Sequence, residues 1–108
     1  MKAKPAKVTE FTTETIDARL LLKVLSDLKR GDFSARLPAE QTGLTGKIYD
    51  SLNEVIDLNQ GMAKEFDRVA TVVGKEGRIK QRAALPMATG SWAECINSVN
   101  TLIADLVQ

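Results

Sequence analysis

Apolar side chains recur at alternating spacings of four and three residues through the middle of the chain. This spacing is typical of an a/d heptad stripe, along which one helix of a coiled coil packs against another. The stripe consists of Ile48, Leu52, Val55, Asn59, Met62, Phe66, Val69 and Val73. Its one polar member, Asn59, stands at an a position, where a buried amide can pair with its symmetry mate. The pattern predicts a long helix that forms a parallel homodimer; the alternative is a monomeric helix with an apolar face.

The same spacing recurs on both sides of the central stripe. Near the C-terminus it places Trp92, Ile96, Val99, Ile103 and Leu106, which coincide with the first five members of the stripe after a shift of 44 residues. This shift also sets Asn97 on Asn53. A shorter version upstream consists of Leu21, Val24 and Leu28. We therefore expect a repeated unit of helix, connector and helix, with the central helix shared by both units.

The connectors between these helices are long enough to decide the topology. Glycines end the predicted helices at Gly31 and Gly77. Residues 31–46 can extend over ~50 Å, whereas a helix of ~15 residues is only ~22 Å long. The chain can thus return along the first helix and begin the second in the same direction. We expect Phe33 and Leu37 to anchor the first connector on the helices, and Ile79 and Leu85 to anchor the second. Two such helices bury little alone, and a homodimer would complete a parallel four-helix bundle.

Composition is consistent with an all-α fold and narrows the class of protein. Among the 108 residues, 44% are hydrophobic but only 5% aromatic, which suits a helical protein with a modest aliphatic core. The net charge of +1 gives no sign of nucleic-acid binding, and we expect residues 1–14 to be a disordered basic leader. No membrane segment or signal peptide is expected, because no stretch approaches the ~20 apolar residues that span a bilayer. We expect a cytoplasmic protein.

Catalytic chemistry is poorly represented. The chain has no histidine, so the commonest general base and metal ligand is missing. The stretch TGLTGK has two residues between its glycines where a phosphate-binding loop has four. Cys95 has no partner base and cannot form an internal disulfide. We predict no catalytic, cofactor-binding or metal-binding residue and no cofactor.

The connectors and second helices resemble those of the HAMP linker domains of sensor kinases and chemoreceptors. GDFSARL (Gly31 to Leu37) is similar to the connector of that family, and GKIYDSLNEV (Gly46 to Val55) to the start of its second helix. In the second unit the matches are Gly77, Ile79 and the helix opening GSWAECINSV, with Ala83 at the second anchor position and Leu85 nearby. Both units lack the acidic pair that the family carries before this helix.

The resemblance is greatest to the tandem HAMP domains of soluble hybrid histidine kinases. It implies two units, at residues 15–60 and 61–108, that relay a conformational change to an output domain such as a histidine kinase. The alternative is a passive helical dimerisation adaptor that docks another coiled coil through Leu22, Ile56 or Leu58. The tripeptide Arg30-Gly31-Asp32 also suggests a receptor ligand, but its glycine already has a helix-ending role.

Overall fold

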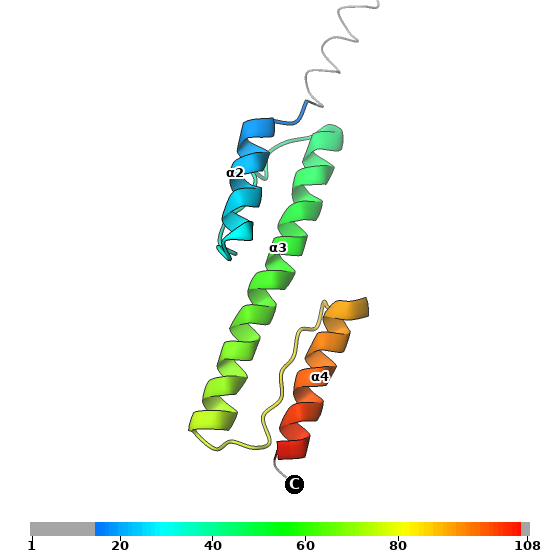
Figure 1. Ribbon diagram of the computed structural model, residues 1–108. Coiled ribbons are helices and arrows are strands. Elements are labelled where there is room, and N and C mark those ends of the chain that lie inside the picture. The colour runs from blue at the N-terminus through cyan, green and yellow to red at the C-terminus, as the bar shows by residue number, and fades with distance from the viewer. Residues whose placement is uncertain (1–14, 107–108) are drawn as a thin grey trace, which may run out of the picture. The chain divides into compact units, whose positions relative to one another are not determined.

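The computed structural model describes residues 15–106, and these residues form helices without any strand. The order is α2 (Ala18–Lys29), α3 (Gly43–Val69), the π-helix η1 (Ala70–Lys75) directly after α3, and α4 (Gly90–Leu106). Figure 1 labels α2, α3 and α4. The predicted all-α class is confirmed for this part of the chain. The leader predicted at residues 1–14 lies outside the described residues.

The chain divides into two compact units, Met1–Asp57 and Leu58–Gln108. Unit 1 contains α2, the first connector and the beginning of α3. Unit 2 contains the remainder of α3, η1, the second connector and α4. In each unit the connector runs back along the helices, so that both helices of the unit point the same way (Figure 1).

The core of unit 1 lies between α2, the connector and α3. Its buried members are Val24, Leu37, Tyr49 and Ile56. Ile16, Leu20, Leu21, Leu28, Ala35 and Leu52 pack against them. The Tyr49 hydroxyl also accepts a hydrogen bond from the Asp17 backbone N–H at 3.1 Å. Since the Asp17 carboxylate caps α2 by accepting from Leu20 N–H at 3.1 Å, this contact fixes the start of α2 against α3.

The core of unit 2 is built in the same way from Val69, Ala83, Ile96 and Ile103. Met62, Phe66, Val73, Leu85 and Val99 pack against it. Gly61 leaves room for the connector, because a Cβ at this position would lie 3.0 Å from Cδ1 of Leu85. The glycine thus allows Leu85 to approach α3 closely, at a cost of ~1 kcal/mol in helix propensity.

Both first helices end at a glycine with a left-handed backbone. At Gly31 (φ +87°) the N–H of Asp32 bonds to the Asp27 carbonyl at 2.9 Å, and the N–H of Gly31 to the Leu28 carbonyl at 2.8 Å. This pair of bonds is a Schellman motif. At Gly77 (φ +70°) the equivalent bond is one residue wider, from Arg78 N–H to the Val72 carbonyl at 2.8 Å. The extra residue is accommodated by the π-helix η1.

The first turn of α3 is closely packed. A Cβ on Gly46 would lie 2.3 Å from the Gln41 carbonyl oxygen, so a side chain cannot be accommodated there. The neighbouring Thr45 is 1% exposed. Its hydroxyl has no hydrogen-bond partner among the residues that the structure describes.

Thr45→Val is therefore expected to stabilise the protein. Valine has nearly the same shape, and its methyl group removes the cost of a buried, unpaired hydroxyl, so a gain of about 1 kcal/mol is expected. Urea denaturation followed by circular dichroism measures it. A loss of stability would mean that the hydroxyl is bonded in solution.

Candidate functional site

The first connector is fastened to α3 by one side-chain amide. The Asn53 Oδ1 accepts from the Leu37 N–H at 2.9 Å, and the Asn53 Nδ2 donates to the Leu37 carbonyl at 3.0 Å. We call this two-bond arrangement an asparagine clamp. It satisfies both backbone groups of a residue that is 3% exposed, at a place where no strand or helix could do so.

Arg36 organises the chain next to this clamp. Its Nη1 donates to the carbonyls of Phe33 and Ala35, both at 2.7 Å. Its Nη2 and Nε donate to Asp57 Oδ1 on α3 at 2.8 and 3.2 Å. The Asp57 side chain is 65% exposed, so this ion pair adds little stability and serves mainly to hold the connector at Arg36 against α3.

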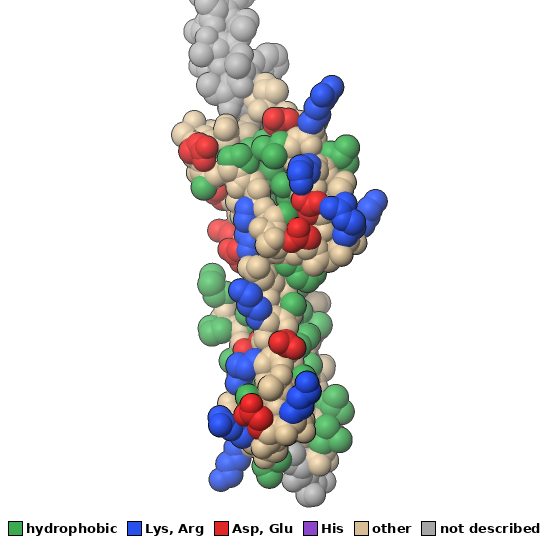
Figure 2. All heavy atoms as spheres, turned by 90° about the vertical axis from the view of Figure 1, so that its left-hand side faces the viewer, with side chains coloured by type: hydrophobic (Ala, Val, Ile, Leu, Met, Phe, Trp, Pro, Cys, Tyr) green, Lys and Arg blue, Asp and Glu red, His purple; other side chains and the backbone are tan. Residues whose placement is uncertain are grey.

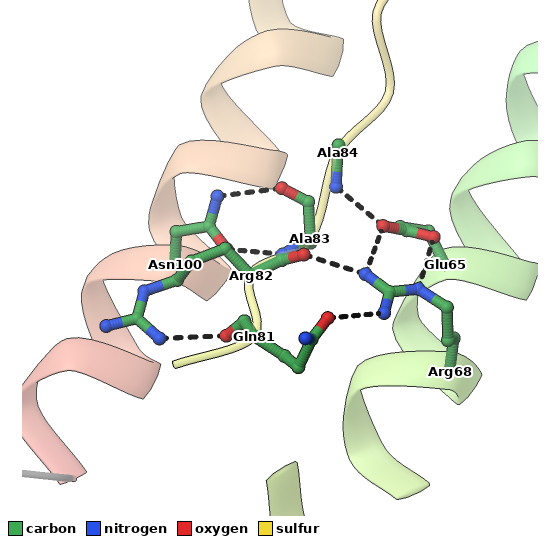
Figure 3. Close-up of polar contacts among 7 residues, drawn as sticks. All are labelled: Glu65, Arg68, Gln81, Arg82, Ala83, Ala84 and Asn100. Atoms are coloured by element: carbon green, nitrogen blue, oxygen red, sulfur yellow. Dashed lines mark hydrogen bonds and ion pairs between the residues drawn. The ribbon is translucent and has the colours of Figure 1, made fainter. Parts of the chain in front are cut away.

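An asparagine clamp also fastens the second connector. The Asn100 Oδ1 accepts from the Ala83 N–H at 2.7 Å, and its Nδ2 donates to the Ala83 carbonyl at 2.9 Å (Figure 3). Arg82 repeats the role of Arg36 and donates to the carbonyls of Ile79 and Gln81, both at 2.8 Å. The two units thus share a side-chain arrangement as well as a helix order.

Unit 2 adds an ion pair on α3 that also holds the connector. Arg68 binds Glu65 through two hydrogen bonds of 3.0 and 2.8 Å. The same Arg68 donates to the Arg82 carbonyl at 2.7 Å, and Glu65 Oε2 accepts from the Ala84 N–H at 2.7 Å (Figure 3). Three backbone residues in a row, from 82 to 84, are therefore bonded to side chains.

The ion pair alters the titration of both partners. Hydrogen bonds from Arg68 lower the pKa of Glu65, and those bonds raise the pKa of Arg68. Because the pKa of Glu65 is lowered on folding, its carboxylate stabilises the fold above the ordinary pKa of a glutamate. That contribution is lost as the pH falls through the lowered value.

The structural match between the units corrects the predicted register. Asn53 corresponds to Asn100, 47 residues later, and the exposed Asn97 has no equivalent role. A slip of three residues is nearly one helical turn, so the apolar spacing could not distinguish a shift of 44 from one of 47. The signal that could have done so is Ser-x-Asn-x-x-Ile, which occurs at residues 51–56 and 98–103.

The predicted connector anchors are placed unequally. Leu37 is buried, and Leu85 packs against the core of unit 2. Phe33 is half-buried but lies outside the apolar cluster of unit 1. Ile79 is 48% exposed, and the buried position of the second connector is taken by Ala83. The size of the aliphatic side chain alone therefore did not identify Ala83 as the buried residue of the second connector.

Within one chain, the predicted heptad stripe is partly buried and partly exposed. Val24, Val69, Ile96 and Ile103 are buried, whereas Ile48, Val55 and Leu106 are exposed by 36%, 42% and 72%. The remaining members are half-buried: Leu21, Leu28, Leu52, Asn59, Met62, Phe66, Val73, Trp92 and Val99. The predicted stripe did not include Tyr49 or Ile56, which belong to the core of unit 1 together with Val24 and Leu37.

The proposed docking role of Ile56 is wrong, because this side chain is 0% exposed. Leu58 is half-buried, and Leu22 is 65% exposed.

Each unit leaves an apolar face at its surface. In unit 1, Leu22, Leu25, Leu44, Ile48 and Val55 are exposed. In unit 2, an apolar groove of about 260 Å³ lies between the end of α3, η1 and α4, with Phe66, Val73, Leu102 and Leu106 in its lining. Figure 2 shows apolar side chains at the surface among charged ones. Contiguous exposed apolar area can mark an interaction face, and these residues are the candidates for one in each unit.

The remaining motifs do not form a chemical site. Within residues 15–106, no three of the metal-binding residue types gather closely enough to hold an ion. Asp32 Oδ1 is bonded to the Ser34 N–H at 3.0 Å and to its hydroxyl, which lowers the pKa of Asp32. Arg30 is paired with Asp27. The tripeptide at residues 30–32 thus has local structural partners.

No helix in the described part of the chain is both long and apolar enough to cross a membrane.

No protein-family model matches the chain, and no solved structure gives a significant match.

Proposed function

We propose that the chain is a dimeric signal-relay module of the HAMP type, in which each unit pairs with that of a second copy to form a parallel four-helix bundle. The observation that carries this proposal is the arrangement of helices and connector within each unit. Two helices point the same way, a clamped connector returns between them, and part of a heptad stripe is left exposed.

A second copy of the chain is the partner that fits this face best. An a/d stripe is self-complementary, because each of its apolar side chains fits between those of an identical, parallel helix. Ile48 and Val55 are separated by seven residues, so both lie on one side of α3. Leu22 and Leu25 on α2 supply further exposed apolar area in the same unit.

Relay needs a bundle with two packings of similar energy, one of which is favoured by an input and recognised by an output. The asparagine clamps support this function, since they keep each connector in place while helices shift against the partner copy. A histidine kinase is the output that the sequence resemblance suggests. The passive adaptor is the competing function, and it needs the dimer but no second packing.

Val55→Lys tests the interface. We expect the wild-type chain to be a dimer at micromolar concentration, and the variant to be a folded monomer, because lysine places a charge in the dimer stripe without entering the core of unit 1. Glu54→Lys, at the exposed neighbouring position, is the control and should remain dimeric. Sedimentation equilibrium measures both. A monomeric wild-type chain would overturn the proposal.

A fused kinase reporter separates relay from adaptor. Conservative substitutions along the stripe, such as Ile48→Val and Val55→Leu, should raise output in some variants and lower it in others while the dimer persists. Output that only follows the amount of dimer would indicate the adaptor.

A further inference from the structure

The ion pair that holds the second connector has no counterpart on the first helix of unit 1 among the residues that the structure describes. When the buried Val69 is matched to the buried Val24, Glu65 and Arg68 correspond to Leu20 and Lys23. Leu20 packs against the apolar core, and Lys23 Nζ binds Asp27 at 3.0 Å. An aliphatic side chain cannot accept a hydrogen bond from the connector, so this helix position serves packing in unit 1 and polar fastening in unit 2.

The connector sequences also allow this polar fastening in unit 2 and not in unit 1. The clamped residues Leu37 and Ala83 correspond, so Ala84 matches Pro38. Proline has no backbone N–H. Unit 1 therefore cannot form a bond like that from the Ala84 N–H to Glu65.

The ion pair that fastens the connector of unit 1 joins it to the following helix instead of the preceding one. Asp57, which binds Arg36, is on α3, the helix that follows the first connector. Its counterpart in unit 2, by the match of Asn53 to Asn100, is Ala104. In unit 1 the connector is thus bonded to the following helix at Asn53 and Asp57. In unit 2 it is bonded to the following helix at Asn100 and to the preceding helix at Glu65 and Arg68.

We propose that Glu65, Arg68 and the backbone of residues 82–84 form a clasp that couples the two helices of unit 2 through their connector. A displacement of α3 in this unit acts on the connector through the clasp, and Asn100 passes it to α4. Resting on the proposed relay, the clasp gives unit 2 a path for movement that is independent of side-chain packing between its helices.

The strength of the bonds supports this assignment. The Glu65 side chain is only 17% exposed, and its two hydrogen bonds with Arg68 form a bidentate ion pair. Hydrogen bonds to ionised groups are roughly twice as strong as neutral ones. Arg68 and Ala84 are held by the same carboxylate, so loss of Glu65 removes the ion pair and the bond to the connector together.

Hydrogen exchange of single amides in the full chain, measured by NMR, tests the clasp. The double variant Glu65→Leu with Arg68→Lys gives unit 2 the residues of unit 1. We expect the Ala84 amide to exchange roughly tenfold faster or more in this variant, and the Ala83 amide to exchange faster as well. Glu65→Gln, which keeps the shape, should show the same direction with a smaller change.

Two controls are used. Glu94→Gln changes an exposed carboxylate on α4 and should leave the exchange of the Ala83 and Ala84 amides unchanged. In the clasp variants, the Leu37 amide of unit 1 should exchange at its wild-type rate. Unchanged exchange at Ala84 in both clasp variants would overturn the clasp. Faster exchange at Ala84 with Ala83 unaffected would show two independent fastenings and overturn the coupling. The exchange rates report the connector amides of unit 2, whereas sedimentation equilibrium and the kinase reporter decide the dimer and the relay. The clasp and the proposed function can therefore fail separately.

Discussion

Leu37→Ala is expected to lower the free energy of unfolding by about 3 kcal/mol. Leu37 is 3% exposed and lies in the core of unit 1 with Val24, Tyr49 and Ile56. The substitution removes its buried methyl groups and leaves a cavity that the surrounding helices fill only in part. The Leu37 backbone stays clamped by Asn53, so the loss reports the side chain alone. Urea denaturation followed by circular dichroism gives the value.

Phe33→Ala is the comparison, because the sequence predicted Phe33 as an equal anchor. Since Phe33 lies outside the apolar cluster, we expect a loss of about 1 kcal/mol. Asp32→Ala should have the smallest effect of the three, because the Asp32 side chain is exposed and bonds locally to Ser34. If Asp32→Ala were the most damaging, the tripeptide at residues 30–32 would need a role beyond ending α2.

The helices were predictable because their signals are local. A 4-3 spacing of apolar residues requires a helix, and a glycine after its last turn permits the left-handed residue that ends it. The sequence was a poorer guide to which apolar residues lie in the core and which lie at the surface. α3 has two adjoining apolar stripes, one with Tyr49 and Ile56 and one with Ile48 and Val55, and both have heptad spacing. Spacing shows that such stripes exist, but the position of the neighbouring elements decides which one is buried in the chain.

The fastening of the connectors could be predicted even less. In the sequence, Glu65 and Arg68 look like an ordinary ion pair on an exposed helix surface, because they are three residues apart and opposite in charge. Their second role depends on residues 82–84 lying against α3, which is a property of the tertiary fold. The same holds for the asparagines, since Asn53, Asn59, Asn97 and Asn100 are chemically equal in the sequence, and the tertiary fold decides that Asn53 clamps Leu37 and Asn100 clamps Ala83.

Asn100→Asp is expected to cost about 2 kcal/mol of stability. Aspartate keeps an oxygen that can accept from the Ala83 N–H. Its second oxygen replaces the Nδ2 that donates to the Ala83 carbonyl, so a bond of 2.9 Å becomes a repulsion between two acceptors. The charge is also brought next to the half-buried connector, where solvation is incomplete.

Asn97→Asp on the same helix is the matched control, because it makes the same chemical change at an exposed position. It should alter stability by less than about 0.5 kcal/mol. Thermal or urea unfolding of both variants compares the two repeat registers directly. With a register of 44 residues, Asn97 would be the counterpart of Asn53, and its variant would be the destabilised one. With the register of 47 that the clamps define, the loss falls on Asn100, and Asn53→Asp should reproduce it in unit 1.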